Sequence, residues 1–462
     1  MHKFFVILGS FFIFLTSCAQ VNDSVMVKKI VDETMTNGMA YKNLRILCKQ
    51  VGARLSGSPQ FLKAVSVTTR MMKDAGADTV FVQPCMVPHW VRGEKEKGYI
   101  LMAGGKNYDF HLCALGNSEG TGVRGISAPV IEIRSMQELD QAGSNLKGKI
   151  VFFNFRMNPT YVTTFRAYGE SGVSRTHGPS LAAKYGAIGA IVRSLSDNLN
   201  NNPHTGVTLY NDSFPKIPAV AISTNDAEYL SRELEKRASV VCYFRTTSKN
   251  LPDAGGFNVI GEIRGTEFAD EIITVGGHLD SWDLAEGAND DGTGVVQSME
   301  VLRTLKAAGI HPKRTVRAVL FANEENGGRG SKQYLAEAKR KNEKHIFALE
   351  SDAGGFTPRG FSLEMQPEAR NRIMSWKNLF YPSSVYDFTI GGSGSDIGPL
   401  KEIGASLAGL SPDTQRYFDI HHASTDVFEN VSERELHLGA ANMTALIYLV
   451  SEYGLPSSQA NH

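Results

Sequence analysis

The stretch from Gly276 to Gly294 concentrates side chains that could bind a metal ion. It contains one histidine, His278, together with four aspartates and one glutamate among glycines and other small residues. Carboxylates this dense repel one another, so folding them together costs free energy unless a positive group lies between them. The stretch therefore predicts a site for a cation.

Further acidic and histidine residues stand at similar places along the chain. Five segments carry His278 after the apolar run 272–275, Asp290 at the start of a helix from 293, Glu324 and Glu325 after 316–321, Asp352 after 346–349, and His421 and His422 after 405–410. In an open α/β sheet, ligands bind just beyond the carboxyl ends of the strands. We therefore expect these side chains to meet at one edge of one sheet.

The expected set of side chains favours zinc or a similar transition metal. It offers two imidazoles and three carboxylates without a thiolate, whereas calcium would favour all-oxygen ligation. The set exceeds what a single catalytic zinc needs, which favours two ions that share a bridging carboxylate. Such a pair can activate a water molecule for attack on a carbonyl or a phosphorus centre, and a free carboxylate nearby would serve as general base.

A regular alternation of strand-like and helical patterns from about residue 258 onward would position these groups. Its helices are expected at 293–308, 330–341, 367–380 and 433–453. This alternation predicts an α/β fold whose doubly wound mixed sheet has helices on both faces. Two more helices are expected earlier in the chain, at 25–47 and 64–74.

Residues 116–247 have a different pattern, with continuous apolar strand-like runs bounded by turn residues and one Ala-rich helix expected at 179–185. The pattern predicts a small mixed α/β or β-barrel module. Few ionisable residues cluster there, so we expect a lid or a partner-facing module. The catalytic domain would then comprise residues 24–115 and 250–462.

The composition indicates a globular protein of about two domains. The chain has 462 residues, 42% of them hydrophobic, and its 48 Lys and Arg residues balance 48 Asp and Glu residues. Neither a basic excess nor a run of Lys and Arg argues for nucleic-acid binding.

The first 18 residues resemble an export signal. A basic start is followed by the apolar run 4–15, which is too short to span a bilayer, and by Leu15-Thr-Ser-Cys18, which resembles the bacterial lipobox. The lipobox predicts a lipid anchor at Cys18, and an ordinary secretory signal with an incidental cysteine is the alternative. Either interpretation predicts an exported protein of the bacterial cell envelope.

Four more cysteines, Cys48, Cys85, Cys113 and Cys242, are far apart in the chain and form no C-x-x-C pair. This spacing excludes a zinc knuckle and a redox motif. Buried free thiols and one or two disulfides both remain open.

Five motifs resemble the metal motifs of the M28 peptidases, a family of dizinc exopeptidases. They are Gly276-Gly-His-Leu-Asp, Gly287-Ala-Asn-Asp-Asp-Gly-Thr-Gly, Asn323-Glu-Glu, Glu350-Ser-Asp and His422-Ala-Ser-Thr-Asp. A carboxypeptidase branch of the family is also similar at Val51-Gly-Ala-Arg-Leu-Ser-Gly-Ser, Pro88-His-Trp-Val-Arg-Gly-Glu, Pro203-His-Thr-Gly-Val and Pro215-Lys-Ile-Pro-Ala. The resemblance covers essentially the whole mature chain, and the insert resembles the protease-associated domain of this family.

The resemblance implies a role for each matching residue. His278 and Asp352 would hold one zinc ion, Glu325 and His422 the other, and Asp290 would bridge both. Glu324 would act as general base, and Asp280 would be the carboxylate that fixes the tautomer of His278. The peptide between Asp290 and Asp291 would be cis, and the chain would form a homodimer.

For several residues near these motifs, a structural role is the alternative to a role in metal or substrate binding. The spacing to Asp426 selects His422 over His421 as the ligand, although Val427 stands where the family usually has Thr. Asp283 and Asp291 are expected to cap helices or turns. Ser395 and Asp396 are as consistent with a plain turn as with substrate contact, and His204 is expected to pack or to lie at an interface.

The leading hypothesis is a dizinc metallo-exopeptidase that hydrolyses dipeptides or short peptides, with Glu324 as general base. An M28 aminopeptidase is the nearest alternative, because the metal motifs are shared. A non-catalytic binding protein like the transferrin receptor ectodomain, and a glutaminyl cyclase with one zinc ion, are more remote. Asp290 together with Glu325 and His422 argues for two ions.

Overall fold

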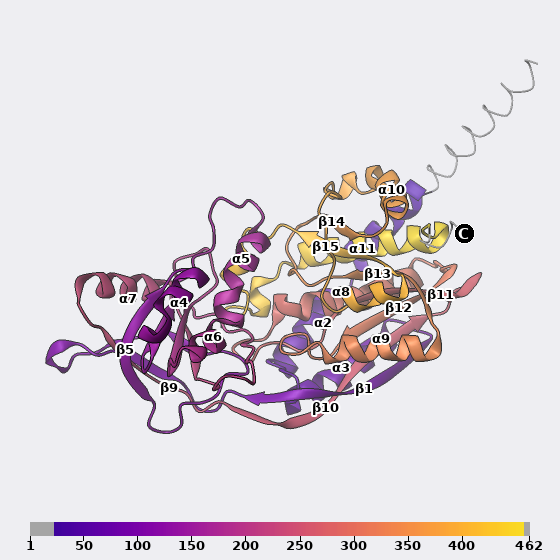
Figure 1. Cartoon of the computed structure of the whole chain (residues 1–462). Helices are drawn as coiled ribbons and strands as arrows, with labels where there is room; N and C mark the ends of the chain where they lie inside the picture. Colours follow the sequence, from indigo (N-terminus) through magenta and orange to yellow (C-terminus); the bar gives the residue numbers. More distant parts are fainter. Residues whose placement is uncertain (1–22, 457–462) are drawn as a thin grey trace, which may run out of the picture.

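The computed structural model describes residues 23–456, which form two β-sheets in two lobes (Figure 1). The expected export signal, lipobox and lipid anchor at Cys18 lie outside the described residues. Among residues 23–456, every helix is too short or too polar to cross a bilayer.

Within the described range, the first sheet has seven strands in the order β1-β10-β12-β11-β13-β15-β14. They are β1 (Thr79–Val91), β10 (Lys249–Ile263), β11 (Phe268–His278), β12 (Arg314–Phe321), β13 (Lys344–Glu350), β14 (Pro358–Glu364) and β15 (Ser406–Pro412). The four strands β12, β11, β13 and β15 are parallel, whereas β1 with β10, β10 with β12, and β14 with β15 pair antiparallel. The mixed sheet expected from the sequence is confirmed.

Helices cover both faces of this sheet. One face packs on α2 (Ala40–Ile46), α3 (Pro59–Asp74), α8 (Thr293–Ala307) and α11 (Glu433–Tyr453), and the other on α9 (Arg329–Lys341) and the 3-10 helix Gly398–Ile403. Strand β12 shows the reason, because Val316, Ala318 and Leu320 face the first set while Val319 and Phe321 face the second. A strand buried on both faces typically has an apolar run, as β12 does from Ala318 to Phe321.

Three of the expected helices have clearly different bounds. The helix expected at 64–74 begins earlier, as α3 at Pro59. The helix expected at 25–47 is interrupted, because residues 23–37 are helical, α2 begins only at Ala40, and Leu47–Val51 forms a π turn. The break falls at Gly38 and Met39, and glycine is a poor helix former. The helix expected at 367–380 ends at Ser375 as α10 (Pro367–Ser375) and continues in short 3-10 turns.

Within the described range, the second sheet has eight strands in the order β3-β2-β9-β5-β6-β7-β8-β4. They are β2 (Lys97–Ile100), β3 (Tyr108–Asp109), β4 (Leu112–Ala114), β5 (Ile126–Ile133), β6 (Ile150–Phe153), β7 (Gly189–Arg193), β8 (Ala219–Ile222) and β9 (Val241–Arg245). Its helices are α4 (Met136–Ala142), α5 (Thr164–Thr176), α6 (Gly178–Lys184) and α7 (Thr224–Lys236). Strands β2 to β4 precede residue 116, the expected start of the insert, and belong to this sheet.

A long two-stranded ribbon of β1 and β10 joins the two lobes and runs along the lower edge of Figure 1. The strands pair from Thr79 with Glu262 to Val91 with Lys249, with one register shift between Val87 and His89. The chain therefore leaves for the second lobe and returns from it at one place.

The four cysteines of the described part of the chain are free thiols. Cys48, Cys113 and Cys242 are buried and Cys85 is partly buried. Burial raises the pKa of Cys48 to about 12 and that of Cys85 to about 11. Of the two alternatives left open by the sequence, the structure has the free thiols.

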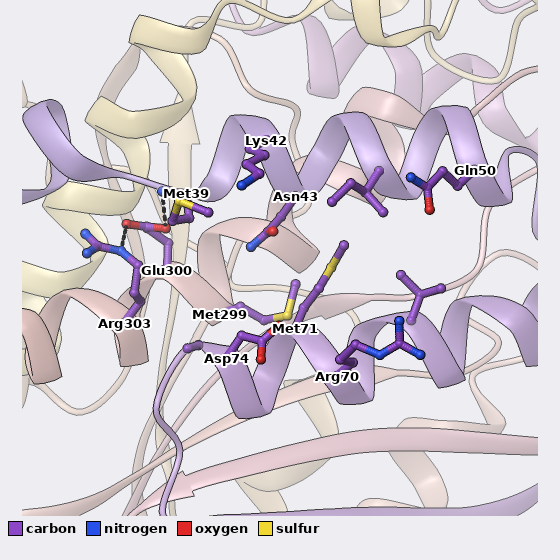
Figure 2. Close-up of a pocket in the computed structure, with 13 residues that line it drawn as sticks. Met39, Lys42, Asn43, Gln50, Arg70, Met71, Asp74, Met299, Glu300 and Arg303 are labelled. Carbon is purple, nitrogen blue, oxygen red and sulfur yellow. Dashed lines mark hydrogen bonds and ion pairs between the residues drawn. The ribbon is translucent and has the colours of Figure 1, made fainter.

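A cavity of about 260 Å³ lies between α2, α3 and α8 (Figure 2). At one end the Glu300 carboxylate accepts the backbone N–H of Met39 at 3.0 Å and pairs with Arg303 at 2.6 Å, which ties α8 to the start of α2. The described residues that line this cavity include no predicted metal ligand. The cavity is thus separate from the expected site.

Candidate metal centre

The predicted ligands lie beyond the carboxyl ends of the parallel strands. His278 is the last residue of β11, Glu324 and Glu325 follow β12, and Asp352 follows β13. Adjacent parallel strands end at the same edge of a sheet, so this edge collects residues that are far apart in the sequence. The convergence expected from the sequence is what the structure shows.

Asp290 lies at the middle of the cluster, between two imidazoles. Its Oδ1 is 3.1 Å from Nε2 of His278, and its Oδ2 is 3.1 Å from Nε2 of His422. Each imidazole also has a carboxylate of its own, because His278 Nε2 lies 3.2 Å from Asp352 Oδ1 and His422 Nε2 lies 3.2 Å from Glu325 Oε2. The five residues thus form two groups of donors that share one carboxylate.

His421 is also close to Asp290, and the sequence left a choice between it and His422. The Nε2 atom of His421 is 3.4 Å from Asp290 Oδ2, and its ring stacks on that of His422 with centroids 3.6 Å apart. His422 faces Glu325 as well as Asp290, whereas His421 packs edge-on against Tyr168. His422 thus has a carboxylate of its own besides Asp290, whereas Asp290 with His421 and His422 also forms a group that could hold an ion. The choice of His422 as the ligand stays a prediction.

Two further aspartates hold the backbone around Asp290. Asp426 accepts the N–H groups of Asn289 at 2.7 Å and of Asp290 at 3.1 Å, and Asp291 accepts the N–H of His278 at 3.0 Å. The peptide between Asp290 and Asp291 is cis, as the resemblance implied. Asp291 has the structural role expected of it, and Asp426 supports the segment despite the Val that follows it.

Asp280 acts through a different atom from the one expected. The Nδ1 atom of His278 lies 3.0 Å from the backbone carbonyl oxygen of Asp280 and 3.8 Å from its carboxylate. The carboxylate instead accepts the backbone N–H of Glu324 at 3.0 Å. The chain turns back just after β11, so the carbonyl of Asp280 is the group that orients His278. The side chain of Asp280 supports the backbone of Glu324.

Glu324 stands beside the two groups of donors. It is partly exposed, and its Oε1 accepts the hydroxyl of Ser395 at 2.8 Å. Ser395 belongs to the glycine-rich loop 391–396, for which the sequence left a plain turn and a substrate contact equally open. Its contact with Glu324 could not be read from the sequence, because nothing in the local pattern indicates which strand end the loop meets.

Burial and mutual repulsion shift the pKa values of the carboxylates in the site. Burial, with the nearby Asp290 charge, raises the pKa of Glu325 to about 8, and burial raises that of Asp352 to about 6. Burial opposes ionisation of Asp290 too, but the imidazoles of His278 and His422 hold its pKa well below the usual range. Cations between these side chains would favour their ionised forms. Imidazole nitrogens and carboxylate oxygens without thiolates fit zinc.

A cavity of about 400 Å³ adjoins the cluster at Asp352. Its walls come from the glycine-rich loop, from Leu410 of β15 and from Phe165 of α5, so that both lobes contribute to it. The cavity gives room for a side chain of a molecule bound at the cluster.

Asp283 lies away from the cluster in a different ion pair. Arg92, which follows β1, contacts both oxygens of Asp283 at 2.5 and 2.9 Å, and donates to the Ala114 carbonyl oxygen at 2.8 Å. Asp283 is therefore structural, but as the ion-pair partner of Arg92 and not as the helix or turn cap expected from the sequence.

Comparisons with known proteins show which proteins this chain resembles in sequence and fold. The profile of "Peptidase family M28" matches residues 258–447. Carboxypeptidase Q of Homo sapiens is 33% identical over 438 residues, which cover 95% of this chain and 90% of that protein. A peptidase M28 precursor from Shewanella amazonensis has a crystal structure with a TM-score of 0.89 at 30% identity, over 94% of this chain and 97% of that chain. A zinc aminopeptidase from Bacillus subtilis shares the fold, with a TM-score of 0.63 at 21% identity over 88% and 94% of the two chains.

Proposed function

The chain belongs to peptidase family M28, and on that premise we propose that it is a dizinc exopeptidase for dipeptides or other short peptides. The coarser statement, that it is a zinc metallopeptidase, rests on the family itself. The finer one rests on a single observation, which is that Asp290 presents one oxygen to each of two imidazoles that have their own carboxylates.

The proposed ligand sets follow the two groups of donors. His278 and Asp352 would hold one zinc ion, Glu325 and His422 the other, and Asp290 would contribute to both. When bound, the two ions would lower the pKa of a water molecule and polarise the scissile carbonyl. The chain itself sets the separation of the groups, since Asp426 and Asp291 fix the backbone on either side of Asp290.

Glu324 is the proposed general base. It is the carboxylate at this edge that faces a hydroxyl instead of an imidazole, and Asp280 holds its backbone in place. Its carboxylate would take a proton from the attacking water molecule and pass it to the leaving amine nitrogen. The hydroxyl of Ser395 keeps one oxygen of Glu324 occupied, which leaves the other free for the proton.

The carboxypeptidase or dipeptidase type is preferred over the aminopeptidase type. The support is the similarity to carboxypeptidase Q, which extends over nearly the whole of both chains. The zinc aminopeptidase shares less sequence, and its likeness concerns the fold.

Export to the cell envelope, with a lipid anchor at Cys18, and assembly as a homodimer are also proposed. The first rests on the apolar run and the lipobox-like residues 15–18, and the second on family resemblance. Membrane fractionation of the wild type and of Cys18→Ala tests the anchor, because loss of the anchor should release the protein into the soluble fraction.

A panel of dipeptides with blocked and free termini tests the reaction, with and without a chelator. We expect hydrolysis of unblocked dipeptides, loss of activity on C-amidated ones, inactivation by the chelator and recovery with zinc. Hydrolysis of N-acetylated dipeptides as well would identify a carboxypeptidase, and their rejection together with C-amidated ones a dipeptidase. Cleavage of C-amidated dipeptides combined with rejection of N-acetylated ones would instead establish an aminopeptidase. Full activity in the presence of the chelator would refute the metallopeptidase mechanism.

A further inference from the structure

A segment of the second lobe, Pro203 to Gly206, lies directly against the backbone of His421 to Ala423. The Nδ1 atom of His204 is 2.6 Å from the carbonyl oxygen of His421, and the N–H of Thr205 donates to the carbonyl oxygen of His422 at 2.9 Å. These contacts form a short antiparallel bridge between the lobes. Residues separated by more than two hundred positions are thus hydrogen-bonded next to a proposed zinc ligand.

The same segment also contacts the side chain of His422. The carbonyl oxygen of Thr205 lies 3.3 Å from Nδ1 of His422, and Nη1 of the buried Arg175 donates to that oxygen at 3.4 Å. Nη1 of Arg175 also lies 3.4 Å from Nδ1 itself, but Arg175 already donates to the carbonyl, which is the nearer neighbour of Nδ1. We therefore assign the proton of His422 to Nδ1, which leaves Nε2 with a lone pair towards Glu325 and Asp290. Outer contacts of this kind orient a metal-binding imidazole and raise its basicity.

The backbone of His422 needs such support. Its φ angle is 59°, in the left-handed region, where a residue with a side chain loses about 1–2 kcal/mol. The hydrogen bond from Thr205 to the His422 carbonyl and that from His204 to the preceding carbonyl hold the chain in this conformation.

His204 is itself firmly held. It is 2% exposed, and its backbone N–H donates to the hydroxyl oxygen of Ser194 at 2.8 Å. Its Nε2 has no hydrogen-bond partner among residues 23–456, so the ring is anchored through Nδ1 alone. Because the His421 carbonyl can only accept, Nδ1 of His204 must be the donor.

We propose that His204 and Thr205 are positioning residues through which the second lobe sets the affinity of the ion held by His422 and Glu325. The inference rests on the proposed function, since it presumes two ions. The other half of the centre does not depend on this segment, because His278 is oriented by Asp280 and Asp291 of its own lobe. The second lobe therefore completes one metal position and leaves the other unaffected.

The test compares His204→Ala with His204→Asn in the full chain. Alanine removes the donor to the His421 carbonyl, whereas the amide nitrogen of asparagine occupies nearly the position of Nδ1 and retains it. Zinc per chain is measured after equilibration with graded concentrations of a chelator. We expect His204→Ala to lose one of its two ions at a chelator concentration roughly 10–100-fold lower than the wild type does. A loss of this size is usual when a group that orients a metal-binding side chain is removed. His204→Asn should keep both ions.

One control and one replacement variant make the outcome decisive. His345→Ala removes another buried histidine, which contacts Thr274 and Glu343 far from the centre, and should destabilise the fold without selective loss of one ion. If His204→Ala does not fold, His204→Gln replaces it, because the glutamine amide lies near Nε2 and not near Nδ1.

The inference is wrong if His204→Ala, or His204→Gln in its place, retains both ions with wild-type affinity or loses both together. A wild-type protein that holds fewer than two zinc ions would instead overturn the proposed dizinc function. The two failures are therefore separate results.

Discussion

Glu324→Gln isolates the proposed general base from the rest of the centre. The substitution replaces one carboxylate oxygen with an amide nitrogen and keeps the shape of the side chain. In the structure the Glu324 side chain bonds to Ser395, and its backbone bonds to Asp280. Neither contact involves a proposed metal ligand, so the variant should bind zinc as the wild type does.

The expected loss is the contribution of general base catalysis. Such a base accelerates a reaction by about 10²–10⁴-fold, which corresponds to roughly 2.7–5.5 kcal/mol in activation free energy. We expect kcat to fall by this factor while KM changes little, because the carboxylate acts on the water molecule and not on bound peptide. The midpoint of thermal unfolding should shift by only a few degrees, since one hydrogen bond from Ser395 is weakened.

The assay measures kcat, KM and zinc per chain on one dipeptide found in the blocked-terminus panel. Glu402→Gln is the matched control, because Glu402 is an exposed partner of Lys339 and should leave all three quantities unchanged. A Glu324→Gln variant that retains two zinc ions and more than a tenth of wild-type kcat would show that another group takes the proton. Loss of zinc in this variant would contradict its position outside the ligand set.

Three other predictions concern stability. Gly294→Ala places a Cβ atom 1.9 Å from the Ser351 carbonyl oxygen, so unfolding free energy from denaturant titration should fall by roughly 3 kcal/mol, whereas Gly255→Ala, with open space around it, should cost far less. Gly172 lies inside α5 with nothing within 4 Å of an added Cβ atom, so Gly172→Ala should raise the unfolding free energy by about 1 kcal/mol; a decrease would contradict this reasoning. In the zinc-free protein, the folded-state pKa of Glu325 is about 8 against 4.5 when unfolded, so the folded chain keeps a proton that the unfolded chain has lost. Thermal stability should therefore fall as pH rises from about 4.5 to 8; a rise over that window in chelated protein would contradict the assignment.

The regular parts of the fold could be predicted because periodicity reports burial directly. Strand β12 is apolar from Ala318 to Phe321 since both its faces are covered, and α11 begins and ends where the pattern of Glu433 to Tyr453 places it. The α5 helix was not expected, because its sequence has weak amphipathicity and two glycines, and it is held by packing of Phe165 and Tyr168 on the segment around Phe418.

The predicted ligands could be found from the sequence because each follows a strand or begins a helix. The groups that orient them could not, because they act through backbone atoms or come from the other lobe. His278 and His422 are oriented by the backbone carbonyls of Asp280 and Thr205. Every residue type has such a carbonyl, so the sequence does not indicate which one will make the contact. The motif Pro203-His-Thr-Gly-Val contains the residues that contact His422. Its position in the predicted insert, far from the predicted ligands in the sequence, gave no reason to connect it with His422.

The ribbon of β1 and β10 has a consequence for how such a chain could be assembled from parts. Val91 and Lys249 are paired neighbours, so residues 92–248 begin and end at adjacent points on one hairpin. A genetic excision between them could be closed by a tight turn without moving the first sheet, since the loop-closure entropy of a short turn is small. The shortened chain would keep the edge that holds His278 and Asp352 but lose the scaffold behind His422. The proposed metal position at His422 and Glu325 would then depend on a part of the chain that the first sheet does not need for its own closure.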